Sequence, residues 1–176
     1  MPSRSGPVQR VAFLGAESTG KTTLAQAVAN ALGEPYVEEV GRRLYVEAGG
    51  DLPLAEYVTI CREQVALEDA LAPRASRVLL VDTNALTTQQ YAFFFFGACP
   101  PEVQAYADRC RERYAHTVVC APDLPFDVDG HRAHPEVQRY QDGAIRNDLT
   151  VRGIPYTVVG GSLAERVAAV RELLGV

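Results

Sequence analysis

The sequence has few cysteines, and they are not arranged in the close pairs that metal and redox sites use. Among its 176 residues are only Cys61, Cys99, Cys110 and Cys120, with no CxxC pair. This spacing fits neither a zinc site nor a dense disulfide framework. We therefore expect reduced, mostly buried thiols in a cytoplasmic protein.

The sequence also lacks an excess of positive charge and any long apolar run. Its net charge is -5 at pH 7, which argues against a general nucleic-acid-binding protein. The most apolar stretch, YAFFFFGA at residues 91–98, is far too short to span a bilayer. The first ten residues, MPSRSGPVQR, contain no apolar segment of a signal peptide. We expect neither nucleic acid nor a membrane as partner, and a disordered leader at residues 1–9.

What the sequence does contain is a regular alternation of short apolar runs and amphipathic segments. Strands are predicted at 10–15, 35–39, 77–83, from 116 to the break at Pro122, and at 154–161. Helical segments are predicted at 21–33, 41–50, 54–72, 85–97, 101–115, 135–153 and 162–175. This order predicts a three-layer α/β fold with a mostly parallel, five-stranded sheet. The chain length favours one domain over residues 10–176.

The segment GAESTGKTT, residues 15–23, follows the first predicted strand and opens the first predicted helix. Gly15, Gly20, Lys21 and Thr22 match the phosphate-loop pattern G-x-x-x-x-G-K-[ST] completely. In that pattern backbone N–H groups cradle phosphates, the lysine reaches the β- and γ-phosphates, and the hydroxyl ligates Mg²⁺. The sequence therefore predicts an ATP–Mg²⁺ site. Its further nucleotide-binding candidates in this segment are Ser18, Thr19 and Thr23.

Asp82 ends the most apolar predicted strand, VLLVD. A carboxylate in this place orders Mg²⁺ in phosphate-loop proteins, so Asp82 is predicted to share the metal with Thr22. The alternative is that Asp82 caps the next helix, because DTNA also suits a helix N-terminus.

Charged residues follow the second predicted strand in VEEVGRRL, residues 37–44. Strand ends line the ligand crevice of α/β folds. Glu38 or Glu39 could therefore accept the proton of an attacking hydroxyl, as could Asp82. Arg42 or Arg43 could hold an anionic group of the substrate. The alternative is a charged surface turn with local ion pairs.

The stretch from Asp123 to His134 contains prolines, glycine and charges without periodicity, which predicts a loop. Such a loop could close over the nucleotide, exclude water and bring Arg132 or Arg139 to the transferred phosphoryl group. His131 and His134 could be read as a metal pair, but a solvated lid is favoured.

Two further features bear on ligand binding. Tyr91 and Phe93–Phe96 are predicted to pack in the core or in an interface rather than to stack on a base. Gly161 follows the last strand and is a candidate contact for the adenine of ATP.

Five stretches together resemble the kinase domain of NadR-like proteins, the ribosylnicotinamide kinase type. They are GAESTGKTTLAQAVA, VEEVGRR, LLVDT, APDLPFDVDGHR and VVGGSLAERV, and they occur in the family's order over nearly the whole chain. The sequence departs from the family where Phe126 replaces a tryptophan and where Glu39–Arg42 lacks an aromatic residue. Because aromatic residues would stack on the acceptor base, the identity of the nucleoside stays open.

The resemblance implies ATP-dependent phosphorylation of the 5′-hydroxyl of nicotinamide riboside by a stand-alone kinase. The catalytic set it implies is Lys21, Glu39, Asp82, Arg132 and Arg139. The substrate set is Glu39, Arg42, Asp82, Phe126 and Asp129. Two other functions remain as alternatives: a kinase for another nucleoside or sugar-like metabolite, and a regulatory nucleotide-binding switch. A homo-oligomer is compatible with the sequence.

Overall fold

A computed structural model describes residues 7–123 and 135–176. At its centre is a five-stranded sheet in the order β2-β3-β1-β4-β5, in which every neighbouring pair is parallel. The strands are β1 (Gln9–Leu14), β2 (Tyr36–Val37), β3 (Val78–Asp82), β4 (His116–Cys120) and β5 (Thr157–Val159). The carboxyl ends of all five strands therefore meet at one edge of the sheet.

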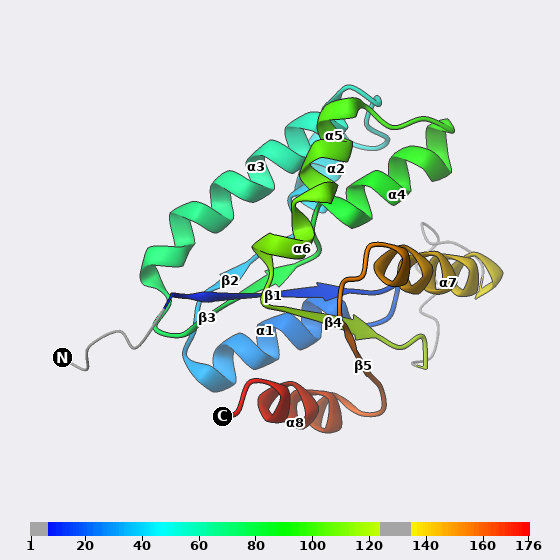
Figure 1. Cartoon of the computed structure of the whole chain (residues 1–176). Helices are drawn as coiled ribbons and strands as arrows, with labels where there is room; N and C mark the ends of the chain where they lie inside the picture. Colours follow the sequence, from blue (N-terminus) through cyan, green and yellow to red (C-terminus); the bar gives the residue numbers. More distant parts are fainter. Residues whose placement is uncertain (1–6, 124–134) are drawn as a thin grey trace.

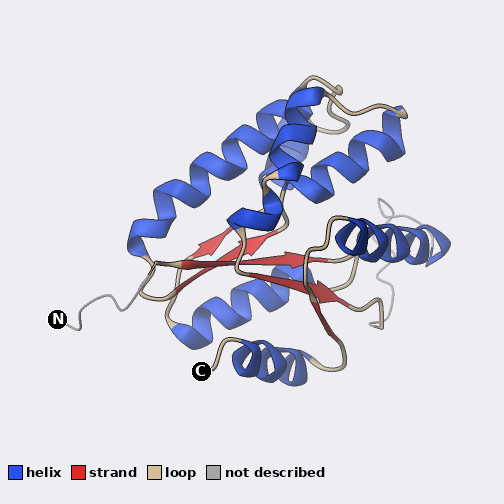
Figure 2. Cartoon of the chain, viewed as in Figure 1, coloured by secondary structure: helices blue, strands red, loops and turns tan. Residues whose placement is uncertain are grey.

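Helices cover both faces of the sheet, which gives three layers (Figures 1 and 2). One face carries α1 (Lys21–Leu32) and α8 (Leu163–Leu173). The other carries α3 (Glu56–Leu71), α4 (Ala85–Phe96), α5 (Pro101–Asp108), α6 (Cys110–Arg113) and α7 (Pro135–Val151). The short helix α2 (Val40–Ala48) packs on α3, and the 3₁₀ turn η1 (Ala72–Arg74) follows α3. The predicted fold class is confirmed.

Alternation along the central strand explains why the sheet needs both helical layers. Ala12 and Leu14 belong to the apolar cluster under α3–α7, while Val11 and Phe13 belong to the cluster over α1 and α8. All four are at most 1% exposed. Side chains of a strand point alternately to opposite faces, so a strand that is apolar throughout must be covered twice.

Some elements differ from the sequence predictions. The single helix expected at 101–115 is two helices, because α5 ends at Asp108 and α6 begins at Cys110. The weak point expected at Gly143 does not interrupt α7, which runs continuously from Pro135 to Val151. Among the residues that the structure describes, no helix combines the length and the apolar character needed to cross a bilayer.

Candidate active site

The loop between β1 and α1 has the compact build of a phosphate cradle. Gly15 has a φ of 152°, and a Cβ there would lie 2.7 Å from Thr19 Oγ1 and 2.9 Å from the Cys120 carbonyl oxygen. Any side chain at this position would therefore collide with the loop and with β4. Thr19 is fully buried, and its hydroxyl donates to the Ala16 carbonyl at 2.8 Å. Ser18 adopts a left-handed φ of 58°, which lets the loop turn.

Lys21 and Thr22 begin α1 directly after this loop. The Lys21 ammonium donates to the Ala16 carbonyl oxygen at 2.8 Å, so the lysine side chain lies back across the loop. Gly20 precedes α1 with a φ of 78° and has no side chain to cap the helix. The N–H groups of the first turn and the positive end of the helix dipole are thus available to an anion.

Asp82 lies beside this loop because β3 pairs with β1 so that Phe13 is the partner of Asp82. One oxygen of its carboxylate accepts from the Thr22 hydroxyl at 2.6 Å and from the Tyr36 hydroxyl at 3.1 Å. The two residues predicted to share Mg²⁺ therefore lie within hydrogen-bond distance of each other. Helix capping falls to Asn84 instead, whose side chain accepts from the Leu86 N–H at 3.0 Å.

The environment of Asp82 fits a bound cation. Its side chain is fully buried, and its second oxygen, Oδ1, has no hydrogen-bond partner among the described residues. Burial raises the pKa of this carboxyl, although Thr22, Lys21, Tyr36 and Arg42 act against the rise. A buried, unpartnered carboxylate oxygen is costly unless another group meets it. Mg²⁺ prefers oxygen ligands of this kind together with water and phosphate.

Glu39 and Glu38, which the sequence left undecided, have different surroundings. Glu38 is exposed and forms an ion pair with Arg43 at 3.0 Å, while Arg43 also pairs with Glu63 at 2.9 Å. Glu39 is partly buried, and loss of water raises the pKa of its carboxyl, with Lys21 opposing and Asp82 adding to the rise. Glu39 is thus the carboxylate that shares the electrostatic environment of the phosphate loop.

Arg42 and Arg43 also differ in their surroundings. Arg43 is held by surface carboxylates, as above. Arg42 is exposed, and its charge acts on both Glu39 and Asp82. Arg42 is therefore the one available to an anionic group at this site.

A pocket of about 190 Å³ lies next to the phosphate loop, between α4 and α7. Its walls include Gly15, Ala16, Tyr91, Phe93, Phe94 and Tyr140. Helix α4 thus supplies most of the aromatic surface next to the loop, with one aromatic ring from α7.

Of the two kinds of packing expected for the phenylalanine tract, packing in the core is wrong, while packing in an interface stays a prediction. Phe93, Phe94, Phe95 and Phe96 are 51%, 46%, 59% and 43% exposed, respectively. Some of these rings contact other aromatic rings: the ring centroids of Phe96 and Tyr57 lie 5.5 Å apart in an edge-on arrangement, and those of Phe94 and Tyr140 lie 6.3 Å apart. The buried residues of α4 lie mostly in its first half and include Thr87, Thr88 and Gln89, whereas the phenylalanines form its last turn.

Two polar contacts that the sequence did not predict tie the phosphate loop to α7. The buried Gln138 donates to the Glu17 carbonyl at 2.8 Å, and the Glu17 N–H donates to the Gln141 side chain at 3.2 Å. The sequence carries a weak signal for Gln138, because it shares a helical face with the buried Ile145 and Leu149.

A third contact that the sequence did not predict comes from α8. Arg166 is 1% exposed, and its guanidinium donates to the Thr19 carbonyl of the phosphate loop at 2.7 Å. The signal in the sequence is its position four and eight residues before the buried Val170 and Leu174, on the apolar stripe of the helix.

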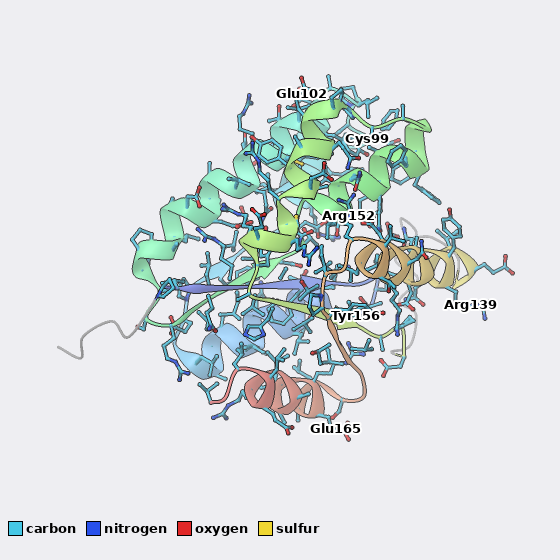
Figure 3. The ribbon with its side chains drawn as sticks, viewed as in Figure 1. Cys99, Glu102, Arg139, Arg152, Tyr156 and Glu165 are labelled. Atoms are coloured by element: carbon cyan, nitrogen blue, oxygen red, sulfur yellow. The ribbon has the colours of Figure 1, made fainter. Side chains whose placement is uncertain are left out.

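The remaining candidates fall into three groups. Thr23 is an exposed residue in the first turn of α1, and Gly161 follows β5 with its N–H donated to Asp123 at 2.6 Å. Arg139 is exposed, and its side chain projects outward from the end of α7 (Figure 3). Outside the described residues lie the predictions for Phe126, Asp129, His131, Arg132 and His134.

Comparison with known proteins agrees with this geometry. The family model described as AAA domain matches residues 10–166. The trifunctional NAD biosynthesis/regulator proteins NadR of Escherichia coli (strain K12) and Salmonella typhimurium (strain LT2) are each 32% identical to this chain over 130 residues. Those residues are 72% of this chain and 31% of each relative, so the match spans about a third of the relatives' length.

Solved structures show the same fold. NadR protein in complex with NR matches with a TM-score of 0.76 at 21% identity, over 96% of this chain and 52% of that one. NadR protein in complex with NAD and AMP-PNP gives the same score and identity over 96% and 50%. Thymidylate kinase from Ehrlichia chaffeensis matches with a TM-score of 0.67 at 16% identity, over 97% and 100%. The chain therefore belongs to the AAA domain family of phosphate-loop proteins and is a homologue of NadR.

Proposed function

We propose that this protein is an ATP-dependent kinase that phosphorylates the 5′-hydroxyl of nicotinamide riboside. The observation that carries the proposal is the aromatic pocket between α4 and α7, which adjoins the phosphate loop at Gly15 and Ala16. An apolar pocket with aromatic walls suits the flat ring of a nucleoside, and the adjoining loop suits a nucleoside triphosphate. A donor site and an acceptor site thus share one wall.

The residues divide the work as follows. Lys21 and the N-terminus of α1 neutralise the β- and γ-phosphates of ATP. Thr22 and Asp82 would hold Mg²⁺, which when bound neutralises charge on the phosphate oxygens. Glu39 accepts the proton of the attacking hydroxyl. A new bond forms between that oxygen and the γ-phosphorus, the bond to the β–γ bridging oxygen breaks, and ADP leaves.

The raised pKa of Glu39 supports its assignment as the base. A proton acceptor works best when its pKa lies closer to the working pH than that of an ordinary carboxyl group, and loss of water moves Glu39 in that direction. Arg42, whose charge acts on Glu39 and Asp82, would limit the charge that builds up as the hydroxyl ionises.

The relatives supply the choice of nucleoside. The proteins that match by sequence are named for NAD biosynthesis, and one of the matching structures contains NR, nicotinamide riboside. A role in NAD biosynthesis or salvage follows if this chain accepts the same ligand. We further propose that Phe126, Asp129 and Arg132 contact the bound substrates, and that Gly161 contacts the adenine.

A panel of acceptors tests the proposal. ADP formation is measured with Mg²⁺-ATP and, in turn, nicotinamide riboside, adenosine, thymidine and ribose. We expect the highest kcat/KM with nicotinamide riboside, and a loss of about 100-fold or more in Lys21→Met. If only another acceptor stimulates ADP formation, that compound and not nicotinamide riboside is the substrate. ATP turnover without stimulation by any acceptor would contradict the kinase assignment.

A further inference from the structure

The Arg166 guanidinium donates hydrogen bonds to backbone carbonyl groups of three separate segments. It donates to Thr19 O in the phosphate loop at 2.7 Å, to Gly161 O after β5 at 3.0 Å and to Ala121 O after β4 at 3.2 Å. Its charge is balanced by Asp123, which accepts from the same guanidinium. With 1% of the residue exposed, these contacts replace water almost entirely.

Asp123 extends the network to the loop that follows β5. Its second oxygen accepts from the Gly161 N–H at 2.6 Å. At Gly160 a Cβ would lie 2.5 Å from that oxygen, and Gly161 has a φ of 83°, a left-handed conformation that favours glycine. Arg166 and Asp123 therefore connect the loop after β5 to the phosphate loop.

The contact with Thr19 has a consequence for the phosphate side of the loop. In a trans peptide the C=O and the following N–H point in opposite directions. Because Arg166 holds the Thr19 carbonyl, the N–H of Gly20 in the same peptide is turned away from Arg166. The structure has no cis peptide bond among its described residues, so this relation holds for the peptide of Thr19 and Gly20.

We propose that Arg166 is a positioning residue for nucleotide binding, which fixes the Thr19–Gly20 peptide so that its N–H faces the phosphates and couples this peptide to the loop at Gly161. The inference rests on the proposed function, since it assumes that the loop binds ATP. It assigns Arg166 no contact with substrate. It places the effect on the nucleotide, because the acceptor pocket is lined by Gly15 and Ala16 of the phosphate loop but not by Thr19 or Gly20.

The test compares four variants: Arg166→Met, Arg166→Lys, Asp123→Asn and, as a control, Arg171→Met at an exposed position of the same helix. The dissociation constant of Mg²⁺-AMP-PNP is measured by calorimetry, and KM for ATP and for nicotinamide riboside by steady-state kinetics. We expect Arg166→Met to weaken AMP-PNP binding about 10-fold or more, because buried hydrogen bonds to a charged group are lost. KM for nicotinamide riboside should not change. Lysine, a single donor centre, should restore only part of the affinity.

Other outcomes overturn the proposal. If Arg166→Met lowers the melting temperature but binds AMP-PNP as wild type does, Arg166 only stabilises the fold. Equal increases of both KM values would likewise contradict a nucleotide-specific role. If neither Arg166 variant folds, Asp123→Asn decides, since that side chain is 40% exposed and its loss should raise only KM for ATP. A wild-type protein that does not bind AMP-PNP contradicts the proposed function itself, whereas normal wild-type binding with unaffected variants contradicts only this inference.

Discussion

At the scale of single residues, the buried carboxylate of Asp82 lowers the stability of the folded state. The carboxylate is fully buried at the end of β3, and its Oδ1 has no hydrogen-bond partner among the described residues. Burial raises its pKa, which means that folding disfavours the charged form that a metal site needs.

The variant Asp82→Asn tests this conflict. A carboxyl group whose pKa is raised on folding contributes its full stability below the unfolded pKa and loses it as the pH rises through the folded pKa. The side-chain amide of Asn does not ionise, so the variant does not lose stability in this way as the pH rises. Asp82→Asn should therefore melt higher than wild type at pH 8, by about 2–4 °C if roughly 1 kcal/mol is recovered. This advantage should shrink as the pH falls towards 4, while kinase activity is lost throughout.

Melting temperatures from pH 4 to pH 8 without nucleotide or Mg²⁺ are the measurement, and Asp51→Asn at an exposed position is the control. A lower melting temperature for Asp82→Asn at pH 8 would show that the hydrogen bonds with Thr22 and Tyr36 outweigh the cost of the buried charge.

How much of the site the sequence reveals depends on the residue. Lys21, Thr22 and Asp82 are recognisable because a local pattern fixes the loop and a strand end fixes the carboxylate. Glu38 and Glu39 could not be separated, because adjacent residues differ only in which neighbours the fold gives them. Arg166 was missed because its partners are backbone carbonyls, which have no sequence signature.

At the scale of whole elements, α7 acts as a brace for the phosphate loop. Gln138 and Gln141 hold the carbonyl and the N–H of Glu17, so both polar groups of one loop residue are fixed by one helix. The same helix supplies Tyr140 to the aromatic pocket. A movement of α7 would therefore disturb both the loop and the pocket.

Replacing Gln138 by leucine tests whether α7 holds the conformation of the phosphate loop. The variant removes the hydrogen bond that Gln138 donates to the Glu17 carbonyl, a contribution of about 0.5–1.5 kcal/mol. We expect KM to rise for ATP and for the acceptor together, in contrast to the split expected for Arg166. The control is Asn147→Leu, the same kind of change at an exposed position of α7. An unchanged KM for both substrates in Gln138→Leu would show that α7 does not set the loop's conformation.

The bounds of helices were predicted well where the apolar periodicity ends at a glycine or proline, and poorly where no such residue marks the end. Gly33 ends α1 in a left-handed conformation, as its position suggested. The division near Arg109 has no proline or glycine to mark it, so residues 101–115 read as one helix. The phenylalanine tract was predicted wrongly because hydrophobicity suggests burial, whereas the fold buries the first half of α4, polar residues included, and exposes its last turn.

At the scale of the whole molecule, the parallel sheet explains why distant segments meet. The phosphate loop follows β1, Asp82 ends β3 and Glu39 comes shortly after β2, and the carboxyl ends of these strands lie at one edge. The alternation of strands and helices was enough to predict that edge. It was not enough to predict the pocket, since the packing of α4 against α7 depends on side-chain contacts across more than 40 residues of sequence.

The most direct test of the account follows the γ-phosphate of ATP. With labelled ATP, Mg²⁺ and nicotinamide riboside, the product is separated and the label counted in phosphorylated nucleoside and in inorganic phosphate. The account predicts that nearly all of the label is recovered as a 5′-phosphate on nicotinamide riboside, and that Lys21→Met yields neither product. Label found mainly in inorganic phosphate, whether or not the nucleoside is present, would contradict it.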